Sequence, residues 1–164
     1  MKTGAHNLRD HLRLIVPLFG VITAVWALRL VMDLAHCPAS AVRMASVNVA
    51  GSVAVLVAVV LIHFKRFGGY PSIVLTAFLL TAWEQVLVVL AILATVLTGW
   101  VNIYTAPEYS YGGSHLRHIV GHLTFGLGLE GLLAAAMGCA LLWILRRLVP
   151  VTVLTASGKH VIQR

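Results

Sequence analysis

Charge is scarce in this chain. Only 10% of its 164 residues are Asp, Glu, Lys or Arg, and five of these are acidic, whereas 60% of all residues are hydrophobic. The mean hydropathy is +0.94. A water-soluble domain of this size needs a far larger charged surface. The shortage of charge therefore excludes an ordinary soluble globular domain.

Cysteine is also rare, and several familiar motifs are missing. Of the two cysteines, Cys37 follows the first hydrophobic run and Cys139 lies well inside the last one, so we expect no disulfide between them. The sequence has no Cys-x-x-Cys pair, Walker loop, zinc-protease motif or Gly-x-Ser-x-Gly element. These absences leave open whether the protein is an enzyme.

Four long hydrophobic runs dominate what is present: Leu14–Ala35, Val47–His63, Ser72–Trp100 and His122–Val149. With a rise of about 1.5 Å per residue, each run can cross about 30 Å of hydrocarbon as a helix. The sequence therefore predicts an all-α integral membrane protein, a four-helix transmembrane bundle with helices near 14–36, 47–64, 72–100 and 118–149. Residues 1–13 form a basic inner-surface segment in this interpretation, and residues 150–164 form a cytoplasmic tail.

The formal net charge of +7 is unevenly distributed along the chain. Arg43 and Arg117 are the basic residues of the first and third loops, and Arg29 lies inside the first run. The other nine lie in the N-terminus, the second loop and the C-terminus: Lys2, Arg9, Arg13, Lys65, Arg66, Arg146, Arg147, Lys159 and Arg164. This asymmetry follows the positive-inside rule and predicts both termini on the cytoplasmic side of an inner membrane. Because topology and anionic headgroups account for the basic excess, we expect no nucleic-acid partner.

Four ionisable residues interrupt the hydrophobic runs: Arg29, Asp33, Glu84 and Glu130. Arg29 and Asp33 are four residues apart on one helical face. Counting from the helix ends places Arg29, Glu84 and Glu130 at similar depths, about 10–12 Å below the outer surface. Because an uncompensated charge in hydrocarbon is costly, we expect these groups to meet inside the bundle. They would form either a proton or ion relay or a satisfied polar network that fixes the helix register.

A histidine cluster begins the fourth hydrophobic run. His115, His118 and His122 are spaced i, i+3 and i+7, so a helix places them on one face, and the same face continues to Gly126 and Glu130. Ser114, directly before them, is a good N-cap. The predicted topology puts further candidate ligands on the same outer side of the membrane, namely His36, Cys37 and Glu108.

Imidazole-rich sites suit transition metals such as Zn, Cu or Fe. A b-type haem is a second possibility, because helical bundles hold haem iron between histidines of different helices. The iron would then need His36, or another donor from outside the fourth helix, opposite one histidine of that helix, and Arg117 would pair with a haem propionate. A proton or quinone site without metal is the third interpretation, and a structural polar patch is the fourth.

These patterns support three hypotheses. The first is a small membrane redox or metal-handling component whose histidine cluster binds a metal or haem. The alternative is a non-catalytic accessory subunit, whose Gly- and Ala-rich fourth helix packs on other membrane subunits or on another copy of the chain. The second alternative is a proton-coupled or ion-conducting pore. In all three, the lipid bilayer is the surrounding partner.

Overall fold

The computed structural model of the chain describes residues 8–106, 114–149, 152–154 and 160–162. The helices are α1 (Leu8–Leu34), α2 (Ala39–Met44), α3 (Val47–Lys65), α4 (Tyr70–Thr98), α5 (His115–Gly121), the π-helix η2 (His122–Glu130) and α6 (Gly131–Leu148). Because α5, η2 and α6 follow one another without a break, they form one long helix. The predicted helical fold is confirmed, since this helix and three others are long and apolar enough to cross a membrane.

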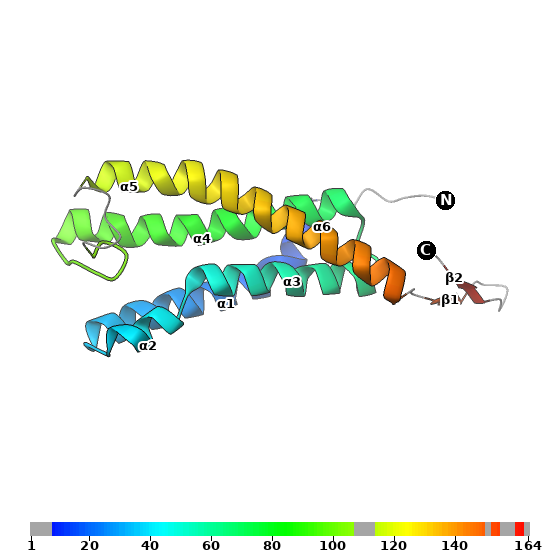
Figure 1. The fold of residues 1–164 in the computed structure, drawn as a ribbon, viewed down its shortest axis with the longest axis horizontal. Helices are drawn as coiled ribbons and strands as arrows, with labels where there is room; N and C mark the ends of the chain where they lie inside the picture. Colours follow the sequence, from blue (N-terminus) through cyan, green and yellow to red (C-terminus); the bar gives the residue numbers. More distant parts are fainter. Residues whose placement is uncertain (1–7, 107–113, 150–151, 155–159, 163–164) are drawn as a thin grey trace.

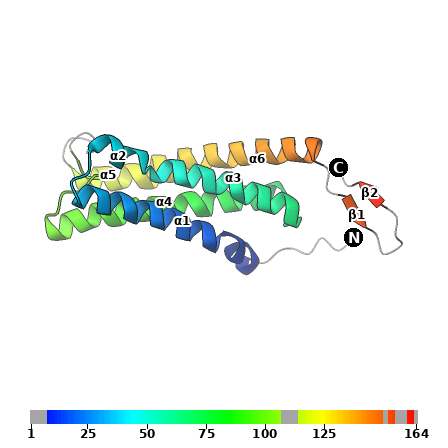
Figure 2. The same ribbon diagram turned by 90° about the horizontal axis from the view of Figure 1, so that it is seen from below.

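The long helices alternate in direction, so α1 begins at the end of the bundle where α6 finishes (Figures 1 and 2). The opposite end carries α2, the segment that follows α4, and the start of α5. Beyond α6, strands β1 (Thr152–Leu154) and β2 (His160–Ile162) pair antiparallel, with Val153 opposite Val161. Because the number of long helices is even, the start of α1 and the end of α6 lie at the same end of the bundle.

Helix α4 is the central element, because it packs against α1, α3, α5, η2 and α6. In its most hydrophobic stretch, 50% of the α4 residues are buried inside the protein, whereas the corresponding share is 22% for α1 and for the α5–η2–α6 helix. The outward faces of those two helices are apolar and exposed, as expected for surfaces that meet lipid. Polar residues on α4 are therefore better buried inside the bundle than those on α1 or on the α5–η2–α6 helix.

Local sequence signals explain where the helices begin and end. The Ser46 hydroxyl accepts the N–H of Val49 at the start of α3, and the Ser114 hydroxyl accepts the N–H of Arg117 at the start of α5. The predicted N-cap at Ser114 is thus confirmed. Gly99 ends α4 with φ of 73°, a left-handed conformation that glycine adopts without strain. Helix α1 begins earlier than its hydrophobic run, at Leu8 rather than near residue 14.

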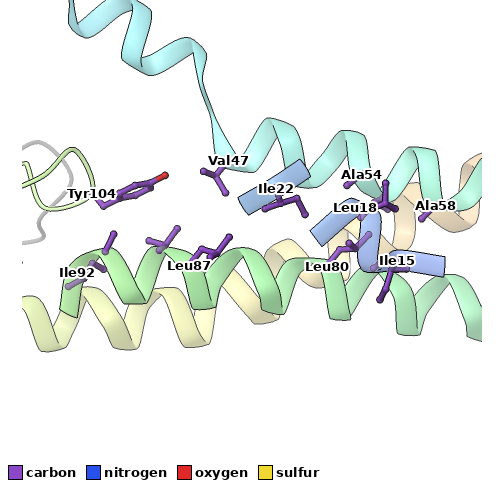
Figure 3. Close-up of a cluster of buried hydrophobic side chains, with 14 of the residues drawn as sticks. Ile15, Leu18, Ile22, Val47, Ala54, Ala58, Leu80, Leu87, Ile92 and Tyr104 are labelled. Atoms are coloured by element: carbon purple, nitrogen blue, oxygen red, sulfur yellow. The ribbon is translucent and has the colours of Figure 1, made fainter. Parts of the chain in front are cut away.

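Aliphatic side chains from α1, α3 and α4 fill the interior (Figure 3). Ile15 and Ile22 of α1 and Leu80 and Ile92 of α4 have no measurable exposure. Ala54 and Ala58 let α3 approach these residues closely. In a bilayer such packing stabilises the bundle through van der Waals contact, since lipid tails are as apolar as leucine.

Two glycines of α6 permit close contact with other helices of the same chain. A Cβ on Gly131 would lie 2.8 Å from Cε1 of Phe78, and a Cβ on Gly138 would lie 2.8 Å from Cγ2 of Ile73. Real Cβ atoms do not approach other atoms this closely. These two positions therefore set the distance between α6 and its neighbours α3 and α4.

Candidate functional site

The side chain of Gln85 lies at the centre of a polar cluster inside the bundle. Gln85 is 2% exposed and occupies the middle of α4. Its Nε2 donates to Oε2 of Glu130 at 2.8 Å, and its Oε1 lies 2.7 Å from Nδ1 of His122. Nδ2 of Asn48, on α3, makes a longer contact of 3.5 Å with the other oxygen of Glu130. One amide therefore links the first and last residues of η2.

The imidazoles of His118 and His122 face each other across one helical turn. Their Nε2 atoms are 3.2 Å apart, and their ring centroids are 5.0 Å apart. His118 is 6% exposed, so its ring is buried against the bundle. Its Nδ1 has no hydrogen-bond partner among the described residues, and the same is true of Nδ1 of His115.

The order of donors and acceptors follows from the chemistry of each group. An ionised Glu130 can only accept, so the Gln85 amide donates to it and presents its oxygen to His122. Nδ1 of His122 must then carry the proton, which leaves a lone pair on its Nε2. This nitrogen therefore points its lone pair toward His118, where it can accept a proton or bind a metal ion.

The long helix that carries the histidines is π-helical between two residues of the cluster, His122 and Glu130. The π-helix η2 begins at His122 and ends at Glu130, with α-helix on both sides. Hydrogen bonds from i to i+5 are less favourable than α-helical ones, and π-helical turns are frequent at functional sites. Gly126, within η2, lies directly against the Gln85 side chain, so a Cβ at this position would collide with the amide. The absence of a side chain at Gly126 thus makes room for the Gln85 side chain.

Glu84 lies beside Gln85 on α4 and is also buried, at 4% exposure. Its carboxylate fits against the backbone of α3 at Gly51, where a Cβ would collide with Oε2. Oε1 of Glu84 has no hydrogen-bond partner in the described part of the chain. The structure therefore brings Glu84 and Glu130, two of the four predicted ionisable residues, to neighbouring positions between α3, α4 and η2.

Two clefts meet at Glu130. The larger, of about 650 Å³, runs along α5 and η2 and is lined by Arg117, His118, His122, Phe125 and Glu130, among others. The smaller, of about 260 Å³, lies between α3, α4 and the start of α6, and its polar lining consists of Asn48, Ser52, Thr81, Glu84 and Glu130. One carboxylate therefore borders both the histidine pair and the second acidic residue.

Arg29 and Asp33 hold the segment that follows α4. Oδ2 of Asp33 accepts the backbone N–H of Ile103 at 2.8 Å, and the Arg29 guanidinium lies 4.9 Å from the centroid of the Tyr104 ring. The neighbouring Asn102 donates to the carbonyl of Ala91 and to the hydroxyl of Thr95, both at 2.9 Å. These contacts fix the segment on the end of the bundle.

The phenol of Tyr104, in this segment, is affected by charged residues of both α1 and α4. Its burial raises the pKa of the phenol to about 12, although the positive charge of Arg29 acts in the opposite direction. The negative charge of Glu84 adds to the rise in this pKa. Tyr104 thus lies close enough to Arg29 and to Glu84 to be affected by both charges, while Arg29 and Asp33 themselves contact the segment that follows α4.

The other predicted ligands that the structure describes lie apart from the histidine pair. His36 and Cys37 lie in the turn between α1 and α2, which Figure 1 shows across the bundle from α5. Glu108 lies outside the described residues. Within the described ranges, no group of three or more His, Cys, Asp or Glu side chains is arranged to hold a metal ion. The predicted three-histidine cluster is therefore a close pair, His118 and His122, with His115 one turn earlier.

Sequence reasoning assigned no site role to Gln85 or to Asn48. Both are polar residues in hydrophobic runs, which is the available sequence signal, but an uncharged amide is a weaker indication of a buried site than the carboxylate of Glu84. The spacing of Gly126, Gly128 and Gly131 also matches the Gly-x-Gly-x-x-Gly pattern of nucleotide-binding loops. Here these glycines lie inside a continuous helix, without the strand and turn that such loops require.

Comparisons with models of protein families, with curated proteins and with solved structures found no match to this chain. The chemistry of the cluster must therefore be inferred from its own residues.

Proposed function

We propose that this protein is a metal-handling component of a membrane, which binds a transition-metal ion between His118 and His122. The 3.2 Å separation of the two Nε2 atoms carries this proposal. Two nitrogen ligands of a tetrahedral Zn²⁺, each about 2.0–2.1 Å from the ion, lie about 3.3 Å apart. The pair can therefore accept such an ion with little movement, once the proton between the nitrogens is displaced.

The surroundings of His122 support the same role. Metal-binding histidines usually donate their second ring nitrogen to a carboxylate or carbonyl oxygen, which fixes the tautomer and the ring orientation. Nδ1 of His122 has such a partner in the amide oxygen of Gln85, which Glu130 holds in turn. His118 lacks this support, since its Nδ1 is unpartnered within the described chain.

Two protein ligands leave coordination positions open. His115 supplies a third nitrogen if its side chain turns toward His118, and water from the 650 Å³ cleft can fill the rest. Open positions are typical of sites that exchange ligands, whereas structural zinc sites are closed. A haem between these two histidines is disfavoured, because neighbouring turns of one helix cannot present ligands to opposite faces of the iron.

The distribution of basic residues supports an orientation in an inner membrane with both termini on the cytoplasmic side. The turn between α3 and α4 carries Lys65 and Arg66, and α6 ends with Arg146 and Arg147. The guanidinium of Arg147 lies 4.2 Å from the Trp143 ring centroid, an arrangement suited to an interface. In this orientation the histidine pair lies in the outer half of the bilayer.

Metal analysis of the purified protein tests the proposal. Protein produced in zinc-supplemented medium should carry about one ion per chain, and His118→Gln and His122→Gln should each lose most of it. His63→Gln is the matched control. His63 is a buried histidine near the C-terminal end of α3, away from the histidine pair, and it contacts the carbonyl of Val149. Wild-type protein without metal, or both variants with full occupancy, would refute the histidine site. A Soret band would instead establish haem.

A further inference from the structure

We propose that the 260 Å³ cleft between α3, α4 and the start of α6 is a second ion site, built from oxygen donors, which binds a hard divalent cation of the Mg²⁺ or Mn²⁺ class. This inference does not depend on metal binding by His118 and His122.

The donors in this cleft are of one chemical kind. Its lining offers the carboxylates of Glu84 and Glu130, the hydroxyls of Ser52 and Thr81, and the amide of Asn48. None of the described residues that line it carries a positive charge or an imidazole. Mg²⁺ and Mn²⁺ prefer oxygen ligands, whereas softer ions prefer the nitrogen of imidazole. The cleft is thus chemically distinct from the histidine pair, although Glu130 borders both.

Glu84 is the observation that points to a ligand. Its side chain is 4% exposed and lines the cleft, and its Oε1 has no hydrogen-bond partner in the part of the chain that the structure describes. A buried carboxylate oxygen without a partner is costly, because burial removes it from water without a replacement. A bound cation would supply the missing partner.

The electrostatics favour the same occupant. Glu130 is close enough to Glu84 for their charges to repel, and both lie in helices that are long and apolar enough to cross a membrane. Repulsion between two carboxylates is strong in a medium of low polarity. A divalent cation would neutralise both, and it would need no change in the bond from Gln85 to Oε2 of Glu130. Each carboxylate oxygen has a second lone pair available for an ion.

The size of the cleft suits a partly hydrated ion. Mg²⁺ commonly binds through one or two carboxylates and keeps several of its waters. One water molecule occupies about 30 Å³ in the liquid, so about 260 Å³ accommodates an ion with several waters. Ser52, Thr81 and the side-chain oxygen of Asn48 line the cleft and would hydrogen-bond those waters.

Mn²⁺ alone is the probe for this site. Binding to the full-length protein in detergent is measured from the decrease of the electron paramagnetic resonance signal of free Mn²⁺. We expect about one Mn²⁺ per wild-type chain, and an affinity at least about 10-fold lower in both Glu84→Gln and Glu130→Gln, because even outer-shell changes cost metal sites 10- to 100-fold. Asp33→Asn removes the same charge from the end of α1 and should retain wild-type affinity.

Gly51→Ala keeps both carboxylates but pushes the Glu84 carboxylate out of its position against α3. It should also weaken Mn²⁺ binding, and its elution volume on size exclusion confirms that it is folded. The double change His118→Gln with His122→Gln should retain Mn²⁺, which separates this site from the histidine site. An absence of Mn²⁺ binding in folded wild-type protein, or equal binding in the Glu84→Gln and Glu130→Gln variants, would overturn the inference.

Discussion

Replacing Gln85 with leucine should separate the histidine pair from the carboxylate that orients it. The change keeps a side chain of similar size but removes the bond to Glu130 at 2.8 Å and the bond to His122 at 2.7 Å. Interhelical hydrogen bonds within membranes contribute about 0.6 kcal/mol on average and at most about 1.7 kcal/mol. Two lost bonds therefore predict a decrease of about 1–3 kcal/mol in the free energy of unfolding.

The effect on metal binding should be of similar size. Loss of an outer-shell partner usually weakens a metal site by about 10- to 100-fold, which equals about 1.4–2.8 kcal/mol. Zn²⁺ affinity is measured in detergent by competition with a chromophoric chelator, and stability by thermal unfolding of the same samples.

Thr76→Val provides the matched control for Gln85→Leu. Thr76 is a buried polar residue on the same helix, at 2% exposure, and its hydroxyl has no hydrogen-bond partner among the residues described. Removing an unpartnered buried hydroxyl should leave the free energy of unfolding unchanged or raise it, with no effect on Zn²⁺ affinity. If Gln85→Leu binds Zn²⁺ within twofold of the wild type, the amide does not orient His122 as inferred.

Two further predictions concern packing and pH. Gly138→Ala should lower the free energy of unfolding by about 1–3 kcal/mol, because its Cβ would overlap Ile73, whereas Gly20→Ala in α1, with no described atom within 4 Å of the added carbon, should be neutral or stabilising in the same thermal unfolding assay. Tyr104 should remain neutral at pH 11, because its pKa is about 12 when folded and about 10 when unfolded. The unfolded chain then loses this proton first, so stability should fall as pH rises from 10 to 12, and Tyr104→Phe should lessen that fall in chemical unfolding measured across this range. Equal pH dependence of the variant and the wild type would contradict the burial of the phenol.

The helices were predictable because their signal extends over many residues. A run such as Ser72–Trp100 needs no knowledge of its neighbours to be recognised as a membrane-crossing helix, and Ser114 marks a helix start through its immediate sequence alone. The short α2 was missed because its six residues, from Ala39 to Met44, carry no long pattern.

The candidate site was predictable only where counting residues along a helix gives the face or the depth of a side chain. His118, His122 and Glu130 share a face by simple counting, and depth alone suggested that Glu84 lies near Glu130. The partners of Arg29 and Asp33 depend on how residues after α4 fold back over the bundle end, which no periodicity encodes. The role of Gln85 depends on the close approach of α4 and η2 at Gly126, which the sequence of either helix alone does not reveal.

The π-helical segment also affects how the fourth helix tolerates a change in length. Each i to i+5 hydrogen bond spans one more residue than an α-helical bond, so η2 holds an additional residue relative to ordinary α-helix. Deleting a single residue between His122 and Glu130 would allow ordinary α-helix to form. In an uninterrupted α-helix such a deletion rotates everything beyond it by about 100° about the axis, but here the loss of the wider turn offsets much of that rotation. Gly138 would then stay near Ile73 while the wider turn beside Gln85 is lost, so this segment gives the helix a place where one residue can be removed with little effect on the packing of α6.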